Sequence, residues 1–313
     1  MSRVIVTRIV FMLAAIFVVL TALFFGIRLG VGDPTIAIQG TYATAESLQA
    51  LREALGLDKP LWEQYLIYMA GLLRGDFGVS LQNGQPVLTQ ILAVVPYTFD
   101  LTIIGLLIGV VLGVPLGFVA AVRRNSKLDH VIRVMTLSGV SVPPFIMGYF
   151  LIIIFVIGLG LFPVAGGGEL GEPLSRMRYL FLPGLSLGLI MTSYVTRLAR
   201  TTVLEILSKD FIRTAKAKGL DQRTILVRHV LRLSLVTIVT LVGLYATITI
   251  GSSVVIETVF SRPGVGRLIV GAVAQSDYMV VQGTIIFYAA FVGIVNLLVD
   301  LTYTIIDPRI RYE

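Results

Sequence analysis

The sequence predicts an all-α membrane protein with six transmembrane helices, on the basis of its composition and the spacing of its uncharged runs. Of the 313 residues, 56% are hydrophobic and 14% are charged, and the mean hydropathy is +0.91. Soluble domains carry about 25% charged residues, so a water-soluble globule is excluded. A helix needs about 20 residues to cross a hydrocarbon core about 30 Å thick. Uncharged runs that can form such a membrane-crossing helix occupy residues 9–27, 101–122, 134–162, 180–196, 233–256 and 279–299.

The first predicted span, residues 9–27, follows Arg3 and Arg8 and has the charge pattern of a secretory signal peptide. Its apolar run is longer than the roughly 7 to 15 residues of a signal-peptide core, and no small-residue cleavage site follows it directly. We therefore interpret it as an uncleaved transmembrane helix.

Residues 28–100 are too many for a simple connection and predict an extracytoplasmic helical subdomain. Thr44 can cap a helix that ends at Gly56, and Pro60 can begin a second helix. The second helix carries an apolar stripe of Leu61, Trp62, Tyr65, Leu66, Met69 and Leu73. We expect this stripe to pack on the membrane helices or to lie at the membrane interface, and direct ligand binding is the alternative.

The second span carries a glycine every four residues, and these glycines lie along one helix face: Gly105, Gly109, Gly113 and Gly117. Small residues at this spacing let two helices approach closely and gain van der Waals contact that lipid cannot replace. We expect a helix-packing face, with a ligand groove as the alternative. In the third span, Pro143 and Pro144 predict a kink or a short interfacial segment.

None of the six predicted spans contains Asp, Glu, Lys, Arg or His. Ion-driven transporters usually hold such groups within the membrane, so proton relays and charge-coupled symport are disfavoured. Sodium sites built from carbonyls and hydroxyls stay open. The chain also lacks a G-x-x-x-x-G-K-[ST] phosphate loop, so it does not hydrolyse ATP by that route.

Catalytic and metal sites are also disfavoured. The chain contains no Cys, and His130 and His229 lack companions at metal-ligand spacing. The G-x-S-x-G pattern around Ser186 lies in an apolar helix and not in a strand-to-helix turn. We therefore expect no catalytic residue and no bound metal.

Lys and Arg are distributed unevenly between the two predicted sides of the membrane. Seventeen lie on the side of both termini and eight on the other side, which places both termini in the cytoplasm. This bias accounts for the net charge of +7, so nucleic-acid binding is not expected. The chain then divides into a terminal segment with the first span (1–27), the outer subdomain (28–100), a five-helix core (101–299) and a cytoplasmic tail (300–313).

The largest charged loop, residues 197–232, holds nine Lys or Arg and three acidic residues. Ser208 or Asp210 can cap a short helix through Lys218, Gly219 can adopt the left-handed conformation after it, and Asp221 can cap a second helix. Phe211 and Ala215 share a face of the first helix, and cations surround them. An apolar knob of this kind suits a groove on a partner protein, whereas a loop facing lipid headgroups is the alternative.

This loop resembles the cytoplasmic EAA loop of ABC-importer permeases, in the form found in the dipeptide, oligopeptide and nickel family (DppB/OppB-like). The general pattern is E-A-A, three residues, G, nine residues and I-x-L-P. Thr214 and Ala215 occupy the two alanine positions, and Gly219 occupies the glycine position. The chain departs from the pattern at three positions, with Arg213 for Glu, His229 for Ile and Arg232 for Pro.

These departures resemble the peptide-permease variant of the loop, R-T-A-x-A-K-G-L followed by R-H-x-L-R. Shorter landmarks of the same family follow in order along the chain, among them Gly32-Asp33-Pro34, Glu257-Thr258-Val259-Phe260-Ser261, Pro263-Gly264-Val265-Gly266-Arg267 and Asp307-Pro308-Arg309-Ile310-Arg311-Tyr312. Each landmark is weak when taken alone. In this order and spacing they indicate the family strongly.

The resemblance implies a type I ABC importer permease fold, with an extracytoplasmic helical insertion after the first span, in a bacterial inner membrane. It implies three kinds of partner: a second homologous permease subunit (DppC/OppC-like), two ABC ATPase subunits and an extracytoplasmic substrate-binding protein. The ATPase subunits would use ATP and Mg, and this chain would bind no cofactor. Dipeptides or oligopeptides are the expected cargo. The alternatives are nickel chelates, peptide-like conjugates and, with less support, an ion-coupled secondary transporter.

The resemblance also implies which residues couple the chain to the ATPase: Asp210, Phe211, Arg213, Thr214, Ala215, Lys216, Ala217, Lys218, Gly219, Leu220 and Asp221. For the substrate pathway, polarity and position suggest Asp100, Ser138, Gly139 and Ser141. The alternative for the two serines is a hydrogen bond to a carbonyl of their own helix.

Overall fold

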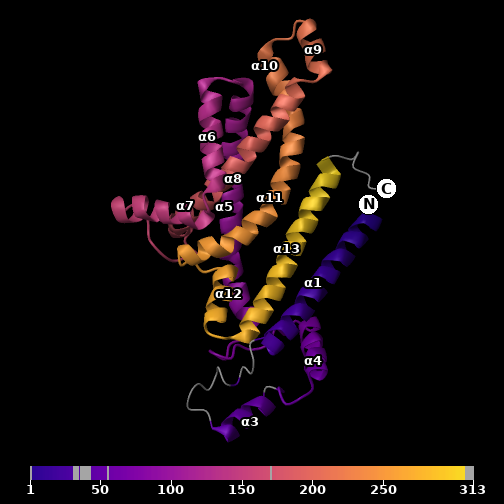
Figure 1. The fold of residues 1–313 in the computed structure, drawn as a ribbon, viewed down its shortest axis with the longest axis vertical. Coiled ribbons are helices and arrows are strands. Elements are labelled where there is room, and N and C mark those ends of the chain that lie inside the picture. The colour runs from indigo at the N-terminus through magenta and orange to yellow at the C-terminus, as the bar shows by residue number, and fades with distance from the viewer. Residues whose placement is uncertain (1, 31–34, 36–43, 55, 170, 307–313) are drawn as a thin grey trace. The chain divides into compact units, whose positions relative to one another are not determined.

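The computed structural model describes residues 2–30, 35, 44–54, 56–169 and 171–306, and this part of the chain is nearly all helical (Figure 1). Its elements are α1 (Ser2–Gly30), α3 (Ala45–Ala54), α4 (Leu61–Leu73), α5 (Val87–Val122), α6 (Lys127–Ser141), α7 (Pro144–Leu151), η2 (Ile152–Gly158), α8 (Pro173–Leu207), α9 (Asp210–Ala217), α10 (Gln222–Thr224), η3 (Ile225–Leu231), α11 (Arg232–Val259), α12 (Val265–Ala274) and α13 (Tyr278–Ile306). The all-α prediction is confirmed. The landmarks at residues 32–34 and 307–312 lie outside the described residues.

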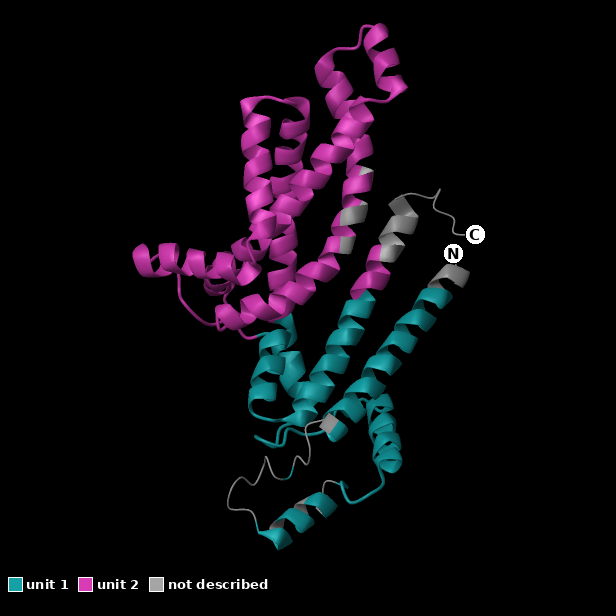
Figure 2. Ribbon diagram, viewed as in Figure 1, with its two compact units in different colours: residues 1–96, 264–294 teal, residues 97–263, 295–313 magenta. Residues whose placement is uncertain are grey.

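Contacts divide the chain into two compact units (Figure 2). Unit 1 comprises residues 1–96 and 264–294, and unit 2 comprises residues 97–263 and 295–313. Helices α5 and α13 therefore contribute to both units. The four-part division expected from the sequence stays a prediction.

Unit 1 has its own hydrophobic core, formed by the start of α5, α12 and the start of α13. Its buried members are Val87, Ile91, Ala272, Val280 and Val281. In the same unit, α4 packs on α1. The Nε of Arg28 donates a hydrogen bond to Gln64 Oε1 (2.9 Å), and the hydroxyls of Thr21 and Tyr65 lie 2.7 Å apart. Part of the predicted apolar stripe therefore contacts α1, whereas Trp62 remains 63% exposed.

In unit 2, one face of α5 packs against α8 through its glycines. All four glycines are buried, and a Cβ atom added to any of them would lie within 3.0 Å of α8. The nearest α8 atoms to such a Cβ are Leu187 Cβ for Gly105 (3.0 Å), Met191 Cγ for Gly109 (2.3 Å), Val195 Cβ for Gly113 (2.7 Å) and the Thr196 carbonyl for Gly117 (2.5 Å). Only a residue without a side chain permits so close an approach of two helix backbones.

The helix of the predicted third span breaks at the two prolines. Val142 and Pro143 have extended backbones, with ψ angles of 122° and 145°. Each of them precedes a proline, and a residue in that position is disfavoured in the α conformation. The axes of the 127–141 and 144–158 segments consequently differ by 105°. The sequence predicted a kink here, and the bend is far sharper than a proline kink within one helix.

Four helices of the described chain are long and apolar enough to cross a membrane: Val6–Leu29, Val87–Val122, Pro173–Leu207 and Tyr278–Val299. The bent pair of α6 with α7 and η2 raises the number to five if it forms one span. In α11, the apolar segment found among the described residues is the shorter Tyr245–Val259. The count of six spans therefore stays a prediction. Helix α5, which contains the second predicted span, begins at Val87 and not at residue 101.

We predict that Gly117→Ala destabilises the protein by about 1–3 kcal/mol, because overpacking of a close contact costs this much. The new methyl group would lie 2.5 Å from a backbone carbonyl, which cannot rotate away as a side chain can. The matched control is Gly251→Ala, since nothing lies within 4 Å of a Cβ at that position in α11. Thermal unfolding in lipid nanodiscs should show a lower midpoint for Gly117→Ala alone. Equal midpoints would contradict close packing of α5 on α8.

Candidate functional sites: a basic loop and an uncharged cavity

The basic loop between α8 and α11 folds into a short helix, a turn and a second helical segment. Helix α9 covers Asp210–Ala217, and α10 and η3 continue from Gln222 to Leu231. Figure 1 shows α9 and α10 together beyond the ends of α8 and α11, all within unit 2. This loop contains every residue for which the sequence predicted a coupling role.

The turn between the two helical segments follows from Gly219 and Asp221. Gly219 has a φ of +79°, a left-handed conformation that glycine adopts without strain, and the next amide, of Leu220, donates a hydrogen bond back to the Ala215 carbonyl (3.2 Å). Asp221 then caps the following helix, accepting a hydrogen bond from the Thr224 amide (3.0 Å). Hydrogen bonding to Thr224 lowers the pKa of Asp221, so the capping carboxylate stays ionised to a lower pH than a free Asp would.

The start of α9 differs from the sequence prediction. Lys209 holds the N-cap position, and no side chain caps the helix there. The Ser208 hydroxyl instead donates to the Glu205 carbonyl (2.7 Å), at the end of α8. Asp210 lies in the first turn, where a carboxylate is favoured by the helix dipole. Capping by Ser208 or Asp210 was therefore a wrong prediction.

One face of α9 is buried against unit 2. Ile212 is 1% exposed and Ala215 is 8% exposed. Both belong to what we name the α9 anchoring cluster, whose buried members are Ala121, Val203, Ile212, Ala215, Ile225 and Val230, from α5, α8, α9 and η3. Sequence reasoning missed Ile212. The spacing of Ile212 and Ala215 by three positions was the available signal, because such residues share a helix face.

The other face of α9 is exposed and mixes an aromatic ring with cations. Phe211 is 43% exposed and Leu220, just after the helix, is 40% exposed. The cations Arg213, Lys216 and Lys218 are also exposed, as are the remaining predicted coupling residues, Asp210, Thr214, Ala217, Gly219 and Asp221. The predicted pairing of Phe211 with Ala215 in one exposed knob was wrong, because the anchoring cluster buries Ala215.

A buried ion pair joins the start of α6 to α8. The Asp129 carboxylate has no exposed surface and accepts hydrogen bonds from Nε and Nη2 of Arg200 at 2.8 and 2.9 Å. It also accepts the Asn125 amide (3.0 Å). Two parallel hydrogen bonds fix the orientation of both side chains. Sequence reasoning missed this pair because 71 positions separate its members.

Asp100, a predicted pathway residue, takes part in a second group of charges. Its carboxylate pairs with Arg176, at the start of α8. The guanidinium of Arg262 lies 3.9 Å from the same carboxylate and has no exposed surface. The nearby Glu257 is also buried, and it accepts a hydrogen bond from Thr98 (2.6 Å). Asp100 is thus held by basic side chains of its own chain.

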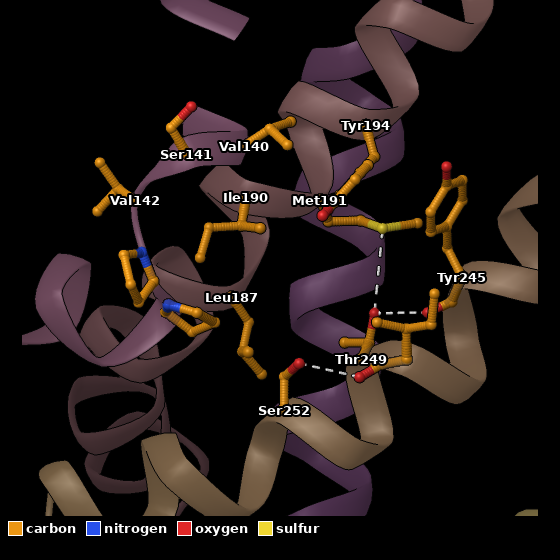
Figure 3. A pocket seen from close by; sticks show the side chains of 13 residues that line it. Val140, Ser141, Val142, Leu187, Ile190, Met191, Tyr194, Tyr245, Thr249 and Ser252 are labelled. Atoms are coloured by element: carbon orange, nitrogen blue, oxygen red, sulfur yellow. Dashed lines mark hydrogen bonds between the residues drawn. The ribbon is translucent and has the colours of Figure 1, made fainter. Parts of the chain in front are cut away.

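A cavity of about 260 Å³ lies in unit 2 beside the break between α6 and α7 (Figure 3). Its wall comes from the break itself, from α8 and from α11. The lining residues are Val140, Ser141, Val142, Pro143, Pro144, Leu187, Ile190, Met191, Tyr194, Tyr245, Ile248, Thr249 and Ser252. All of these lining residues are uncharged.

The cavity combines an aromatic pair with hydroxyls that already have hydrogen-bond acceptors. The rings of Tyr194 and Tyr245 are stacked with centroids 4.9 Å apart. Thr249 donates to the Tyr245 carbonyl (2.9 Å) and Ser252 to the Ile248 carbonyl (3.0 Å), as Figure 3 shows. Ser141 likewise donates to the Leu137 carbonyl (2.9 Å). The hydroxyl oxygens keep lone pairs that can accept hydrogen bonds.

Of the four predicted pathway residues, Ser141 lines this cavity, whereas Asp100, Ser138 and Gly139 do not belong to its wall. Gly139 instead packs on α8, since a Cβ there would lie 2.1 Å from the Ser193 hydroxyl oxygen. The contribution of α8 and α11 was missed, because their lining residues occur in long uncharged runs in which no charged residue marks one face.

The chain matches two family descriptions that together cover nearly all of it. Residues 113–312 match the binding-protein-dependent transport system inner membrane component. Residues 1–102 match the N-terminal part of the membrane component of the same kind of system.

Several relatives align over the whole chain. The glutathione transport system permease protein GsiC of Escherichia coli (strain K12) is 34% identical over 313 residues, and the alignment covers 100% of both chains. A putative peptide transport system permease protein of Brucella abortus (strain 2308) is 38% identical over 314 residues, again with 100% of both chains covered. Among solved structures, an inward-facing conformation of the MetNI methionine ABC transporter has a TM-score of 0.58 at 18% identity, covering 70% of this chain and 97% of that chain. This structural similarity concerns the fold alone.

We predict that Ile212→Ala loosens α9 without unfolding the rest of unit 2. Truncating a buried Ile costs about 2–5 kcal/mol, which corresponds to at least tenfold faster amide exchange in a locally opening segment. Hydrogen–deuterium exchange with mass spectrometry measures this change in residues 210–217. Phe211→Ala is the control, because Phe211 is exposed and lies outside the anchoring cluster. Equal acceleration in both variants would contradict the burial of Ile212.

Proposed function

This chain belongs to the family of binding-protein-dependent transport system inner membrane components and is the permease component of an ABC importer, and we propose that its cargo is a peptide. Hydrolysis of ATP takes place in separate subunits. Two relatives that align over their full length are named for glutathione, a tripeptide, and for peptide transport. Nickel chelates and peptide-like conjugates are the alternative cargo. Membership of this family excludes the alternative that the chain is an ion-coupled secondary transporter.

The difference between the two faces of α9 supports the proposal that the basic loop contacts an ATPase subunit. Its inner face is buried through Ile212 and Ala215, while Phe211 and three nearby cations are exposed. Interface centres are enriched in aromatic residues and Arg, and surrounding charges set orientation and association rate. A solvated loop facing lipid headgroups would not need a helix anchored so firmly on one side.

Helix α8 provides a path from the loop to the cavity. Val203 of α8 belongs to the α9 anchoring cluster, and Leu187, Met191 and Tyr194 of the same helix line the cavity. The helix is continuous from Pro173 to Leu207, so at about 1.5 Å per residue roughly 14 Å separates Val203 from Tyr194. Movement of α9 by a partner would therefore displace the cavity wall. In our proposal, this displacement opens the pathway alternately to the two sides of the membrane.

The proposed assembly contains a second homologous permease subunit of the DppC/OppC type, two ABC ATPase subunits that use ATP and Mg, and an extracytoplasmic substrate-binding protein. The bias of Lys and Arg supports placing the basic loop and both termini in the cytoplasm, on the side of the ATPase subunits. The substrate path would run between the two permease subunits, with Ser141 at its wall. Asp100, Ser138 and Gly139 stay candidates for the same path.

We predict that Phe211→Asp weakens binding of the ATPase subunits by about 2 kcal/mol or more, roughly 30-fold in Kd, as for an aromatic residue at an interface centre. Phe211→Tyr is the matched control, because it keeps the ring and should keep most of the affinity. The measurement is recovery of the ATPase subunits on affinity-tagged permease over a concentration series. Unchanged recovery with Phe211→Asp would count against a docking role for this face of α9.

A further inference from the structure

We propose that the cavity between the α6–α7 break, α8 and α11 is a subsite for one uncharged side chain of a peptide in transit. This inference rests on the proposed peptide cargo and adds a specificity to it. The cavity then acts as a filter within the permease, separate from any selection by the binding protein. Its selectivity follows from three properties of the wall: volume, charge and aromatic content.

The volume suits one side chain and not a whole peptide. Pockets that enclose a complete drug-sized ligand usually measure about 300–1,000 Å³. This cavity measures about 260 Å³, so most of a peptide backbone must remain outside it. A single aromatic or branched aliphatic side chain can enter from that backbone.

The absence of charge from the wall selects against Lys, Arg, Asp and Glu in the cargo. All thirteen lining residues are uncharged, and the hydroxyl hydrogens of Ser141, Thr249 and Ser252 are already donated to carbonyls of their own helices. A charged group entering the cavity would lose water without gaining an ionic partner, which is costly. The charged termini of a peptide are excluded for the same reason.

The aromatic pair favours planar or polarisable side chains. Tyr194 and Tyr245 form one side of the cavity with their rings stacked at an interplanar angle of 27°. Met191 lies beside them, and its sulfur is 4.0 Å from the Thr249 hydroxyl. Aromatic rings and thioether sulfur both interact favourably with a further aromatic ring. We therefore expect Phe to be preferred over small side chains.

The position of the cavity allows its shape to change when the basic loop moves during transport. Its wall includes the extended residues Val142 and Pro143. At these residues the helix breaks, and the helix axis changes direction by 105°. Interrupted helices at membrane depth are tolerated where the irregular backbone is covered by protein or lines a cavity. Because α8 contributes both to this wall and to the α9 anchoring cluster, a movement at the loop changes the shape of the subsite.

The test measures ATP-driven uptake by the complete transporter in proteoliposomes, with Gly-Phe-Gly, Gly-Lys-Gly and triglycine each supplied at saturation of the binding protein. Ser252→Trp fills the cavity from α11. We expect the uptake ratio of Gly-Phe-Gly to triglycine to fall by about tenfold or more, the range that pocket contacts supply. Ser252→Asp adds a carboxylate to the wall, and the ratio of Gly-Lys-Gly to Gly-Phe-Gly should rise.

Thr258→Trp is the matched control. Thr258 is an α11 residue whose hydroxyl, like that of Ser252, donates to the carbonyl four positions earlier (2.9 Å). Thr258 is exposed whereas Ser252 is half-buried, and Thr258 is not part of the cavity wall. Ratios are compared, so a uniform loss of uptake from altered assembly does not imitate the expected result. The ratio in Thr258→Trp should equal that of the native protein.

Three outcomes would overturn the subsite. If Ser252→Trp lowers uptake of all three peptides equally, or leaves all three unchanged, a lipid chain or the partner permease fills the cavity, and the peptide cargo stands. If Ser252→Asp leaves the Lys-to-Phe ratio unchanged, the side chain of the cargo does not reach the wall. If the native transporter takes up none of the peptides, the peptide cargo itself is wrong and the subsite falls with it.

Discussion

The burial of Ile212 and Ala215 against α8 and η3 determines what the basic loop can do. A helix as short as α9, with eight residues, is marginal in isolation and takes its stability from packing. Because its apolar side is used within the chain, its cations and Phe211 are left facing outward. In our proposal, a force applied to that outer face would be transmitted to α8 through the anchoring cluster, since packed side chains resist compression.

Helix α8 also makes the other close contacts that constrain unit 2. Its backbone approaches α5 at four buried glycines, its Arg200 forms a bidentate pair with Asp129 of α6, and its side chains line the cavity together with α11. Breaking a buried ion pair leaves an uncompensated charge, so Asp129 and Arg200 hold α6 and α8 in one relative orientation. Any displacement of α8 must therefore involve α5 and α6 as well, which makes the packed helices move together.

Local patterns were the part of the structure that sequence could predict. The glycine spacing of α5, the prolines at 143 and 144, and the turn at Gly219 depend on residues a few positions apart, and each produces its feature in the structure. Features that join distant segments were missed, including the Asp129–Arg200 pair and the cavity wall from three elements. The inner face of α9 was misassigned, because Ala215 is buried by residues of α8 and η3 that lie outside its own helix.

The most direct test of the docking role of α9 uses the absence of cysteine from the natural sequence. Ala217→Cys introduces the chain's only thiol at an exposed position of α9 and keeps the Phe211 ring, and its rate of labelling by a membrane-impermeant maleimide can be compared in the isolated permease and in the assembled transporter. We predict at least tenfold slower labelling in the assembly, because a partner protein covers this face. Equal rates in the two states would show that the outer face of α9 remains in solvent, and this would contradict a role in receiving force from the ATPase subunits.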